Sequence, residues 1–297
     1  MDKEIVISIV ICSQEEKITE VMEQNISNTI GVPYEIIYIY NEQNMYSIFE
    51  AYNLGVEKAR GHVICFMHND IEYLSDNWGE EVEKVLSMPN VGACAVAGAN
   101  YMRRTPSYYP IGGCYNVMNI VQSTKSEDIE WRTYTNLTEM AVFDGLWFCI
   151  KRKCFDQVRF DSQRYDGFHF YDIDMATQLV VNNYRIIGLP SVKIRHKSGG
   201  CTNTSWLVNS FKYAKKWEDS LPISCISVEK KEAFRLECKA LYSSLKQIFL
   251  TKSYKLLFLW FYFAVKNLKR DPITALITVY THHKIDVANV VDKLDGL

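Results

Sequence analysis

Continuous apolar runs, rather than alternating apolar and polar positions, dominate the first hundred residues of the chain. Segments 4–12 (EIVISIVIC), 34–40 (YEIIYIY) and 62–67 (HVICFM) are rich in β-branched and aromatic residues. Such runs are typical of strands that are buried on both faces, as in a parallel sheet. We therefore predict three strands here and a fourth at 91–98 (VGACAVAG).

Segments with helical spacing separate these predicted strands. The clearest is 47–61, in which Ser47 and Glu50 are spaced as a capping box and Gly61 closes the helix. The alternation of strands and helices predicts an α/β fold with a doubly wound mixed sheet. In that architecture ligands bind outside the carboxyl ends of the strands.

The pattern changes twice further along the chain. Segment 101–136 is rich in Gly, Pro, Ser, Tyr and charged residues, which predicts long loops and a mobile lid. Segment 185–200 indicates edge strands that end in a basic, glycine-rich turn. Strand signals vanish after about 205, so we predict one domain over 1–204 and a helical C-terminal subdomain over 205–297.

Ten consecutive apolar residues lie between lysines at 256–265 (LLFLWFYFAV). A helix needs about twenty such residues to span a bilayer. Because this segment is apolar on every side, three interpretations stay open: burial in a helical core, an oligomer interface, or shallow insertion at a membrane surface.

Composition excludes some classes of function. The formal net charge of -2 argues against a generic nucleic-acid binder. The first apolar run is short and flanked by acids, unlike a signal peptide, so we expect a cytoplasmic protein, peripheral at the inner membrane face if segment 256–265 inserts. The nine cysteines form no CxxC pair and are expected to be reduced core thiols.

Polar residues end the third predicted strand abruptly. The sequence VICFMHND places His68, Asn69 and Asp70 at a carboxyl end, where this architecture binds nucleotides. A carboxylate there suits Mg²⁺ or Mn²⁺, with phosphate oxygens and waters completing the shell. The alternative is that Asp70 merely caps a helix or lies in a loop.

Two later segments also carry candidate chemistry. Asp172 and Asp174 open a predicted helix, where they either stabilise its first turn or supply a general base. His196 follows a strand and lies between Arg195 and Lys197, which suits a diphosphate or a metal ligand. A purely structural histidine is the alternative.

In order and spacing, these motifs resemble those of a family 2 type glycosyltransferase of the GT-A fold, from about residue 5 to residue 200. The segment AYNLGVEKARGHVICFMHND resembles the Asn-x-Gly, Ala-x-Gly and acidic metal-binding series of that family. The segment YDID stands at the position where members of the family usually have Glu-Asp-x-Asp. FDGLWFCIKRKCF, GFHFYDID and IRHKSGG look more particularly like the branch named after a streptomycin-biosynthesis protein.

The resemblance implies metal-assisted transfer of a sugar from a nucleotide-diphosphate donor to a hydroxyl of a glycan, a lipid-linked or a small-molecule acceptor, with inversion and without nucleic acid. It implies a catalytic base at Asp172 and a Mg²⁺ or Mn²⁺ ion on Asp70 and His196. The implied donor contacts are Asn41, Asn53, Arg60, Asn69 and Asp70. The implied acceptor side comprises Asp144, Trp147 and Asp174.

The chain departs from the family pattern at three positions. Tyr40, His68 and Tyr171 stand where many members have acids. They favour an alternative, a catalytically degenerate sugar-nucleotide-binding or scaffolding protein of the same fold. A sugar-nucleotide nucleotidyltransferase is a weaker alternative, since it would carry a glycine-rich basic signature after the first strand, where this chain has CSQEEK.

Overall fold

The computed structural model describes residues 4–107, 115–199 and 202–294, with the backbone alone for 284–294. The chain divides into two compact units. The first comprises Met1–Tyr101 with Gly112–Cys201, and the second comprises Met102–Ile111 with Thr202–Leu297. The assignment of 1–204 as a catalytic domain stays a prediction.

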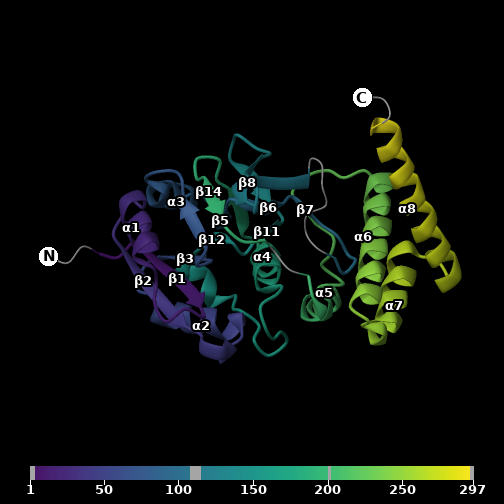
Figure 1. The fold of residues 1–297 in the computed structure, drawn as a ribbon, viewed down its shortest axis with the longest axis horizontal. Helices are drawn as coiled ribbons and strands as arrows, with labels where there is room; N and C mark the ends of the chain where they lie inside the picture. The colour runs from purple at the N-terminus through teal and green to yellow at the C-terminus, as the bar shows by residue number, and fades with distance from the viewer. Residues whose placement is uncertain (1–3, 108–114, 200–201, 295–297) are drawn as a thin grey trace. The chain divides into compact units, whose positions relative to one another are not determined.

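A seven-stranded mixed sheet forms the centre of the first unit (Figure 1). Its order is β10 (Thr138–Met140), β13 (Arg185–Gly188), β5 (Val91–Ala95), β12 (Trp147–Lys151), β3 (Val63–Met67), β1 (Ile7–Ser13) and β2 (Tyr34–Tyr40). Strand β1 runs parallel to both β2 and β3, as the apolar runs predicted. The antiparallel strand β12 lies between β3 and β5 and makes the sheet mixed.

Helices cover both faces of this sheet. They are α1 (Glu20–Thr29), α2 (Ile48–Lys58), α3 (Trp78–Leu86) and α4 (Tyr171–Val181), with the short 3-10 helices η1 (Glu42–Asn44) and η3 (Arg152–Asp156). Ile26 of α1 and Trp78 of α3 share one core cluster with Ile9 of β1. On the other face, the ring of Tyr52 in α2 lies 4.8 Å from that of Phe66 in β3. The capping box predicted at the start of α2 is confirmed.

A second sheet lies beside the first within this unit. Its order is β11 (Val142–Phe143), β6 (Ala97–Ala99), β8 (Asn116–Ser123), β14 (Ile194–His196) and β4 (Ile71–Tyr73), and β9 (Asp128–Arg132) pairs with β8. The prediction of long loops over 101–136 is therefore wrong for 116–132, where two strands pair; every residue of β9 is exposed, which hid the strand. Residues 108–114 of the predicted lid lie outside the described part. Strands β13 and β14 each have two neighbours, so the prediction of edge strands is also wrong.

The second unit is mainly helical. It contains α5 (Thr204–Lys216), β15 (Ile223–Ser224), α6 (Lys230–Leu250), η4 (Tyr254–Leu256), α7 (Leu257–Leu268) and α8 (Pro272–Leu294); β15 pairs with the short strand β7 (Tyr101–Met102). The buried carboxylate of Glu237 in α6 accepts hydrogen bonds from the backbone N–H groups of Arg104 and Thr105. These hydrogen bonds connect residues 104 and 105 to helix α6.

The apolar run at 256–265 forms most of α7, and only one side of that helix is buried. Trp260 is fully buried and its indole N–H donates to the carbonyl of Leu241. Phe258 points outward, with 82% of its surface exposed. Burial in a helical core therefore describes one side of the segment and leaves the other unexplained. No helix in the described residues is long and apolar enough to cross a bilayer.

Candidate functional site

Side chains from two distant segments of the sequence meet at the carboxyl end of β3. His68 and Asp70 directly follow that strand, and the antiparallel register of β14 on β4 sets His196 opposite Ile71, the neighbour of Asp70. His196 Nε2 lies 3.6 Å from Asp70 Oδ1, and His68 Nδ1 lies 3.9 Å from the same oxygen. All three side chains offer ligand atoms within 4.8 Å of one another. We call these residues the His-Asp-His cluster.

The hydrogen bonds of Gln122 fix the tautomer of His196. The two N–H groups of the Gln122 amide face the carbonyls of Ser123, His196 and Ser198, with one N–H shared between two of them, so its oxygen is the atom that lies 3.0 Å from His196 Nδ1. An amide oxygen only accepts, so Nδ1 of His196 carries a proton. In the neutral imidazole, Nε2 then presents a lone pair to Asp70.

Tyr171 fixes the tautomer of His68 in the same way. The single hydroxyl proton of Tyr171 is donated to the carbonyl of Gly145 at 3.1 Å. His68 Nε2, 2.9 Å from the Tyr171 oxygen, must therefore be the donor in that contact. Burial lowers the pKa of His68, so the imidazole is neutral at neutral pH and Nδ1 presents a lone pair to Asp70.

Two imidazoles and one carboxylate thus present lone pairs within 4.8 Å of one another. Asp70 Oδ1 and His196 Nε2 are buried and have no hydrogen-bond partner among the described residues. Buried polar atoms are rarely left this way, because their desolvation is then uncompensated. Two ligands about 2.1 Å from one cation can lie up to about 4.2 Å apart, a limit that both distances to Asp70 satisfy. The two histidines offer nitrogens within 4.8 Å of each other. The cluster therefore fits a divalent cation.

Asp172 lies close to the cluster, on the first turn of α4. One of its carboxylate oxygens accepts a hydrogen bond from the backbone N–H of Gly145 at 2.8 Å, and the other accepts from that of Ile173. The peptide groups of Gly145 therefore connect Asp172 to Tyr171 and, through it, to His68. Burial, followed by the nearby charge of Asp144, raises the pKa of Asp172 to about 7. A carboxylate with that pKa is suited to general acid or base chemistry at neutral pH.

Two of the predicted donor contacts lie at the carboxyl ends of strands. Asn69 follows β3 and donates to the Ser13 hydroxyl at the end of β1, at 2.8 Å. Asn41 follows β2, and its side chain both donates to and accepts from the backbone of Tyr46. The roles of Asn41 and Asn69 toward a donor stay predictions.

Two of the residues predicted for the acceptor side belong to the protein core instead. Trp147 is fully buried in β12 and donates to the hydroxyl of Tyr73, so it has no face to offer a sugar. Asp174 is buried in α4 and accepts hydrogen bonds from Tyr165 and Gln178. The prediction is wrong for both, because β12 lies inside the sheet and Asp174 points into the protein. Asp144, by contrast, lies near Asp172.

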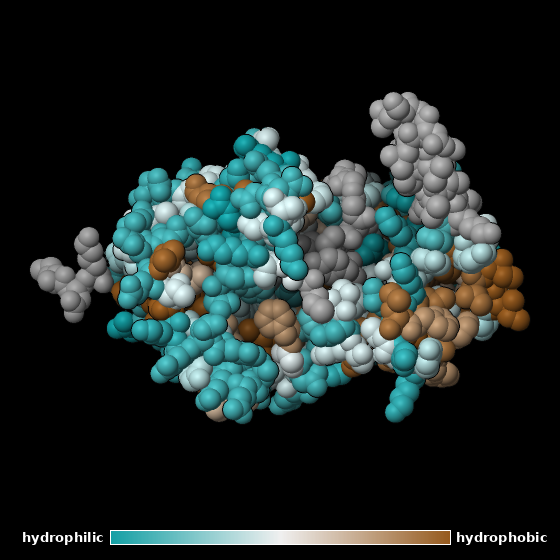
Figure 2. Space-filling view, viewed as in Figure 1, coloured by the Kyte–Doolittle hydropathy of each residue, from teal (hydrophilic) through white to brown (hydrophobic). Residues whose placement is uncertain are grey.

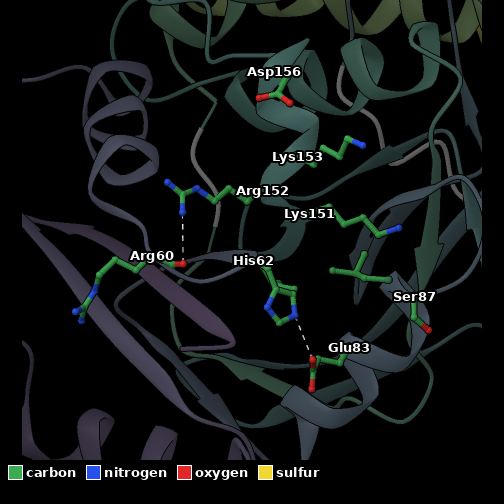
Figure 3. A pocket seen from close by; sticks show the side chains of 10 residues that line it. Arg60, His62, Glu83, Ser87, Lys151, Arg152, Lys153 and Asp156 are labelled. Carbon is green, nitrogen blue, oxygen red and sulfur yellow. Dashed lines mark hydrogen bonds and ion pairs between the residues drawn. The ribbon is translucent and has the colours of Figure 1, made fainter. Parts of the chain in front are cut away.

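The prediction of a donor contact is also wrong for Arg60, whereas that for Asn53 stays a prediction. Asn53 holds both the N–H and the carbonyl of Phe160 from α2. Arg60 precedes β3, forms a 2.7 Å ion pair with Glu35, and so lies at the opposite end of that strand from His68. There it lines a cavity of about 710 Å³ with His62, Lys151 and Glu83 (Figure 3). The position of Arg60 before β3 rather than after it could have been recognised from the sequence.

Three residues that matter to the cluster were not among the predicted ligands and contacts. His68 and Tyr171 looked like departures from an acidic pattern, and Gln122 lies in a strand that was predicted as loop. The exposed ring of Phe168 also lies here, 5.5 Å from that of His68. Part of the predicted basic turn, Gly200, lies outside the described residues.

Comparison with known proteins identifies the class. A model of a glycosyltransferase-like family matches residues 7–215. No curated protein sequence matches the chain. Among solved structures, a mannosyltransferase, PcManGT from Pyrobaculum calidifontis in complex with GDP-Man and Mn²⁺, is 13% identical, with 94% of this chain and 80% of that one covered and a TM-score of 0.46.

A second solved structure, GalNAc-T7 with UDP, GalNAc and Mn²⁺, is 11% identical, with 72% of this chain covered and a TM-score of 0.46. This chain spans about half the length of that one, 49%. The streptomycin-related branch stays a prediction. Because the family model covers more than half of the sequence and the whole His-Asp-His cluster, the chain belongs to the glycosyltransferase-like family and has the predicted GT-A fold.

Proposed function

We propose that this protein transfers a sugar from a nucleotide-diphosphate donor to an acceptor hydroxyl with inversion, with a divalent cation on the His-Asp-His cluster and Asp172 as general base. The family supports the reaction class. The observation that carries the rest is the convergence of three lone pairs beside a carboxylate whose pKa is near 7.

The donor set favours one of the two predicted metals. Two imidazole nitrogens and one carboxylate oxygen suit a transition-metal ion, whereas Mg²⁺ prefers oxygen ligands alone. We therefore propose Mn²⁺ rather than Mg²⁺. When bound, the ion neutralises negative charge that develops on the leaving diphosphate. His68, Asp70 and His196 hold it, while Tyr171 and Gln122 orient the two imidazoles.

Asp172 removes the acceptor proton. Its carboxylate is held in place by two backbone N–H groups, so little reorientation is needed when the acceptor arrives. Burial, and then the negative charge of Asp144, raise the pKa of Asp172, which makes it a stronger base than an exposed aspartate. Asn41, Asn69 and the exposed Phe168 are the residues that we propose for donor and sugar contacts.

The experiment is a thermal-shift panel of UDP-, GDP-, dTDP- and CMP-sugars with and without Mn²⁺, on the wild type, His196→Ala and Asp172→Asn. A ligand at 100 times its Kd stabilises the folded state by about 2.7 kcal/mol. We expect one nucleotide class to stabilise the wild type in a Mn²⁺-dependent way. His196→Ala should lose that response, and Asp172→Asn should keep it.

Release of the free nucleotide then measures turnover. Wild-type turnover that Asp172→Asn abolishes supports the proposal. Turnover that survives in Asp172→Asn rejects the assignment of the base. Metal-dependent binding without turnover in the wild type, with any acceptor tried, favours the degenerate binding protein instead. No response to any donor argues against both functions.

A further inference from the structure

Large apolar side chains are exposed together on the second unit. Phe249 and Leu250 at the end of α6, Tyr254 in η4 and Phe258 in α7 are all more than half exposed. Figure 2 shows apolar surface gathered over α7 and the start of α8. A single exposed apolar residue needs no explanation, whereas a contiguous group on one face usually marks an interaction surface.

Helix α8 exposes four large apolar residues and buries two smaller ones. Ile273, Leu276, Ile277 and Tyr280 follow the i, i+3, i+4, i+7 spacing of one helix face, and all four are exposed. Between them, Ala275 and Val279 point inward and are buried. The described part of this helix therefore has an apolar stripe on each side, and only one of them packs against the protein.

The exposed stripe of α8 is continuous with α7. An apolar groove of about 330 Å³ lies between the two helices, lined by Phe258, Phe261, Tyr262, Val265, Lys266 and Pro272. Pro272 directly precedes Ile273, the first residue of the stripe. We call Phe258, the groove and the four exposed residues of α8 the α7–α8 face.

Basic residues outnumber acidic ones along the segment that forms this face. Between residues 246 and 283 the sequence has six basic residues and one acid, Asp271. Asp271 is engaged at the start of α8, where it accepts from the backbone N–H groups of Ile273 and Thr274. The exposed basic residues are Lys246, Lys252, Lys255, Lys266, Lys269 and Arg270. Of these, Lys266 forms an ion pair with Glu218 at 3.1 Å, and Glu218 also accepts a hydrogen bond from Tyr262 of the groove. Lys252 and Lys255 flank Tyr254 and make no ion pair with the described residues.

The excess of basic residues favours an anionic partner. A two-fold dimer through this face would set the same basic residues of both copies around one interface, where they would repel. An anionic lipid surface attracts each of them and accepts the apolar side chains among its acyl chains. Tyrosines such as Tyr254 and Tyr280 suit the boundary between head groups and hydrocarbon.

We propose that the second unit binds an anionic membrane surface through the α7–α8 face and the exposed basic residues of the same segment. The proposal is independent of the sugar chemistry and goes beyond it. It corresponds to the third interpretation of segment 256–265, with Phe258 rather than the buried Trp260 as the inserting residue.

The test is flotation of the full chain with phosphatidylcholine vesicles, with and without phosphatidylglycerol, at low and high salt. We expect flotation only with phosphatidylglycerol, weakened by salt. Phe258→Ser combined with Ile277→Ser should abolish it, and Val21→Ser, which removes an equally exposed side chain of the first unit, should not. Circular dichroism checks that each variant is folded.

A second pair of variants tests the charge. Each basic residue near an anionic surface contributes about a fivefold change in partition. Lys252→Gln with Lys255→Gln should therefore weaken binding by about 25-fold, and Lys17→Gln with Lys58→Gln, on the first unit, should leave it unchanged. Absence of flotation, equal flotation with neutral vesicles, or equal loss in both lysine pairs overturns the proposal. So does a dimer that the Phe258 and Ile277 variant dissociates without any vesicle binding.

Discussion

Replacing Tyr171 with phenylalanine removes one buried hydroxyl and leaves the ring in place. That hydroxyl accepts from His68 Nε2 at 2.9 Å and donates to the Gly145 carbonyl at 3.1 Å. Without it, Nε2 of His68 loses the hydrogen bond that, among the described residues, sets the tautomer pointing Nδ1 at Asp70. The change therefore acts on the proposed metal site through a residue that never touches the ion.

The size of the effect follows from two buried hydrogen bonds. Each is worth about 1 kcal/mol net, and a buried group left without a partner costs about 1–3 kcal/mol. We expect Tyr171→Phe to lower the free energy of unfolding by about 2–4 kcal/mol. Loss of a residue that orients a metal ligand typically weakens metal binding by about 10–100-fold, or about 1.4–2.8 kcal/mol.

The assay is a Mn²⁺ titration followed by electron paramagnetic resonance of the free ion, with urea unfolding of the same samples. Tyr165→Phe is the matched control, since it also removes a buried tyrosine hydroxyl, one that donates to Asp174 at 3.0 Å. The control should lose about 1.5–3 kcal/mol of stability, comparable to Tyr171→Phe, and bind Mn²⁺ as the wild type does. A Kd for Tyr171→Phe within about twofold of the wild-type value would refute the reasoning.

Four other predictions concern Asp172, Trp147 and Gly145. Because the pKa of Asp172 is raised to about 7 and a general base must be unprotonated, kcat/KM should rise as pH increases through about 7. Asp144→Asn should move this rise in kcat/KM to lower pH, which pH–rate profiles of both proteins measure. Asp172→Asn should lower kcat by about 10²–10⁴-fold with donor binding intact, measured by single turnover. Trp147→Ala should cost about 3–5 kcal/mol in urea unfolding, and an unchanged stability would contradict its burial. Gly145→Ala should weaken Mn²⁺ binding, because a Cβ there would overlap the Tyr171 hydroxyl; unchanged affinity would contradict this.

The sequence indicated the first half of the fold well because each signal there is local. Continuous apolar runs predicted β1, β2 and β3, and a capping box marked the start of α2. Strand β9 was missed because every one of its residues is exposed, so it carries no apolar pattern. The inward position of β14 was missed because it depends on pairing with β8 and β4, which come from distant parts of the chain.

The candidate site was predictable where it depends on strand ends and unpredictable where it depends on hydrogen-bond direction. Asp70 and His196 could be expected near each other because both end strands, and Asp172 because it opens a helix. Tyr171 looked like the loss of an acid, since its hydrogen bonds to His68 and Gly145 appear only after folding. Trp147 was misassigned because an aromatic residue next to a site motif looks the same whether it faces a ligand or the core.

Pulsed electron paramagnetic resonance of the Mn²⁺-loaded protein tests the central claim most directly, because it detects nitrogen atoms bonded to the metal. We predict coupling to two imidazole nitrogens, with one lost in His68→Ala and one in His196→Ala, and no tightly bound Mn²⁺ in Asp70→Ala. Mn²⁺ bound without nitrogen coupling, or bound with unchanged affinity in Asp70→Ala, would contradict the proposed metal site.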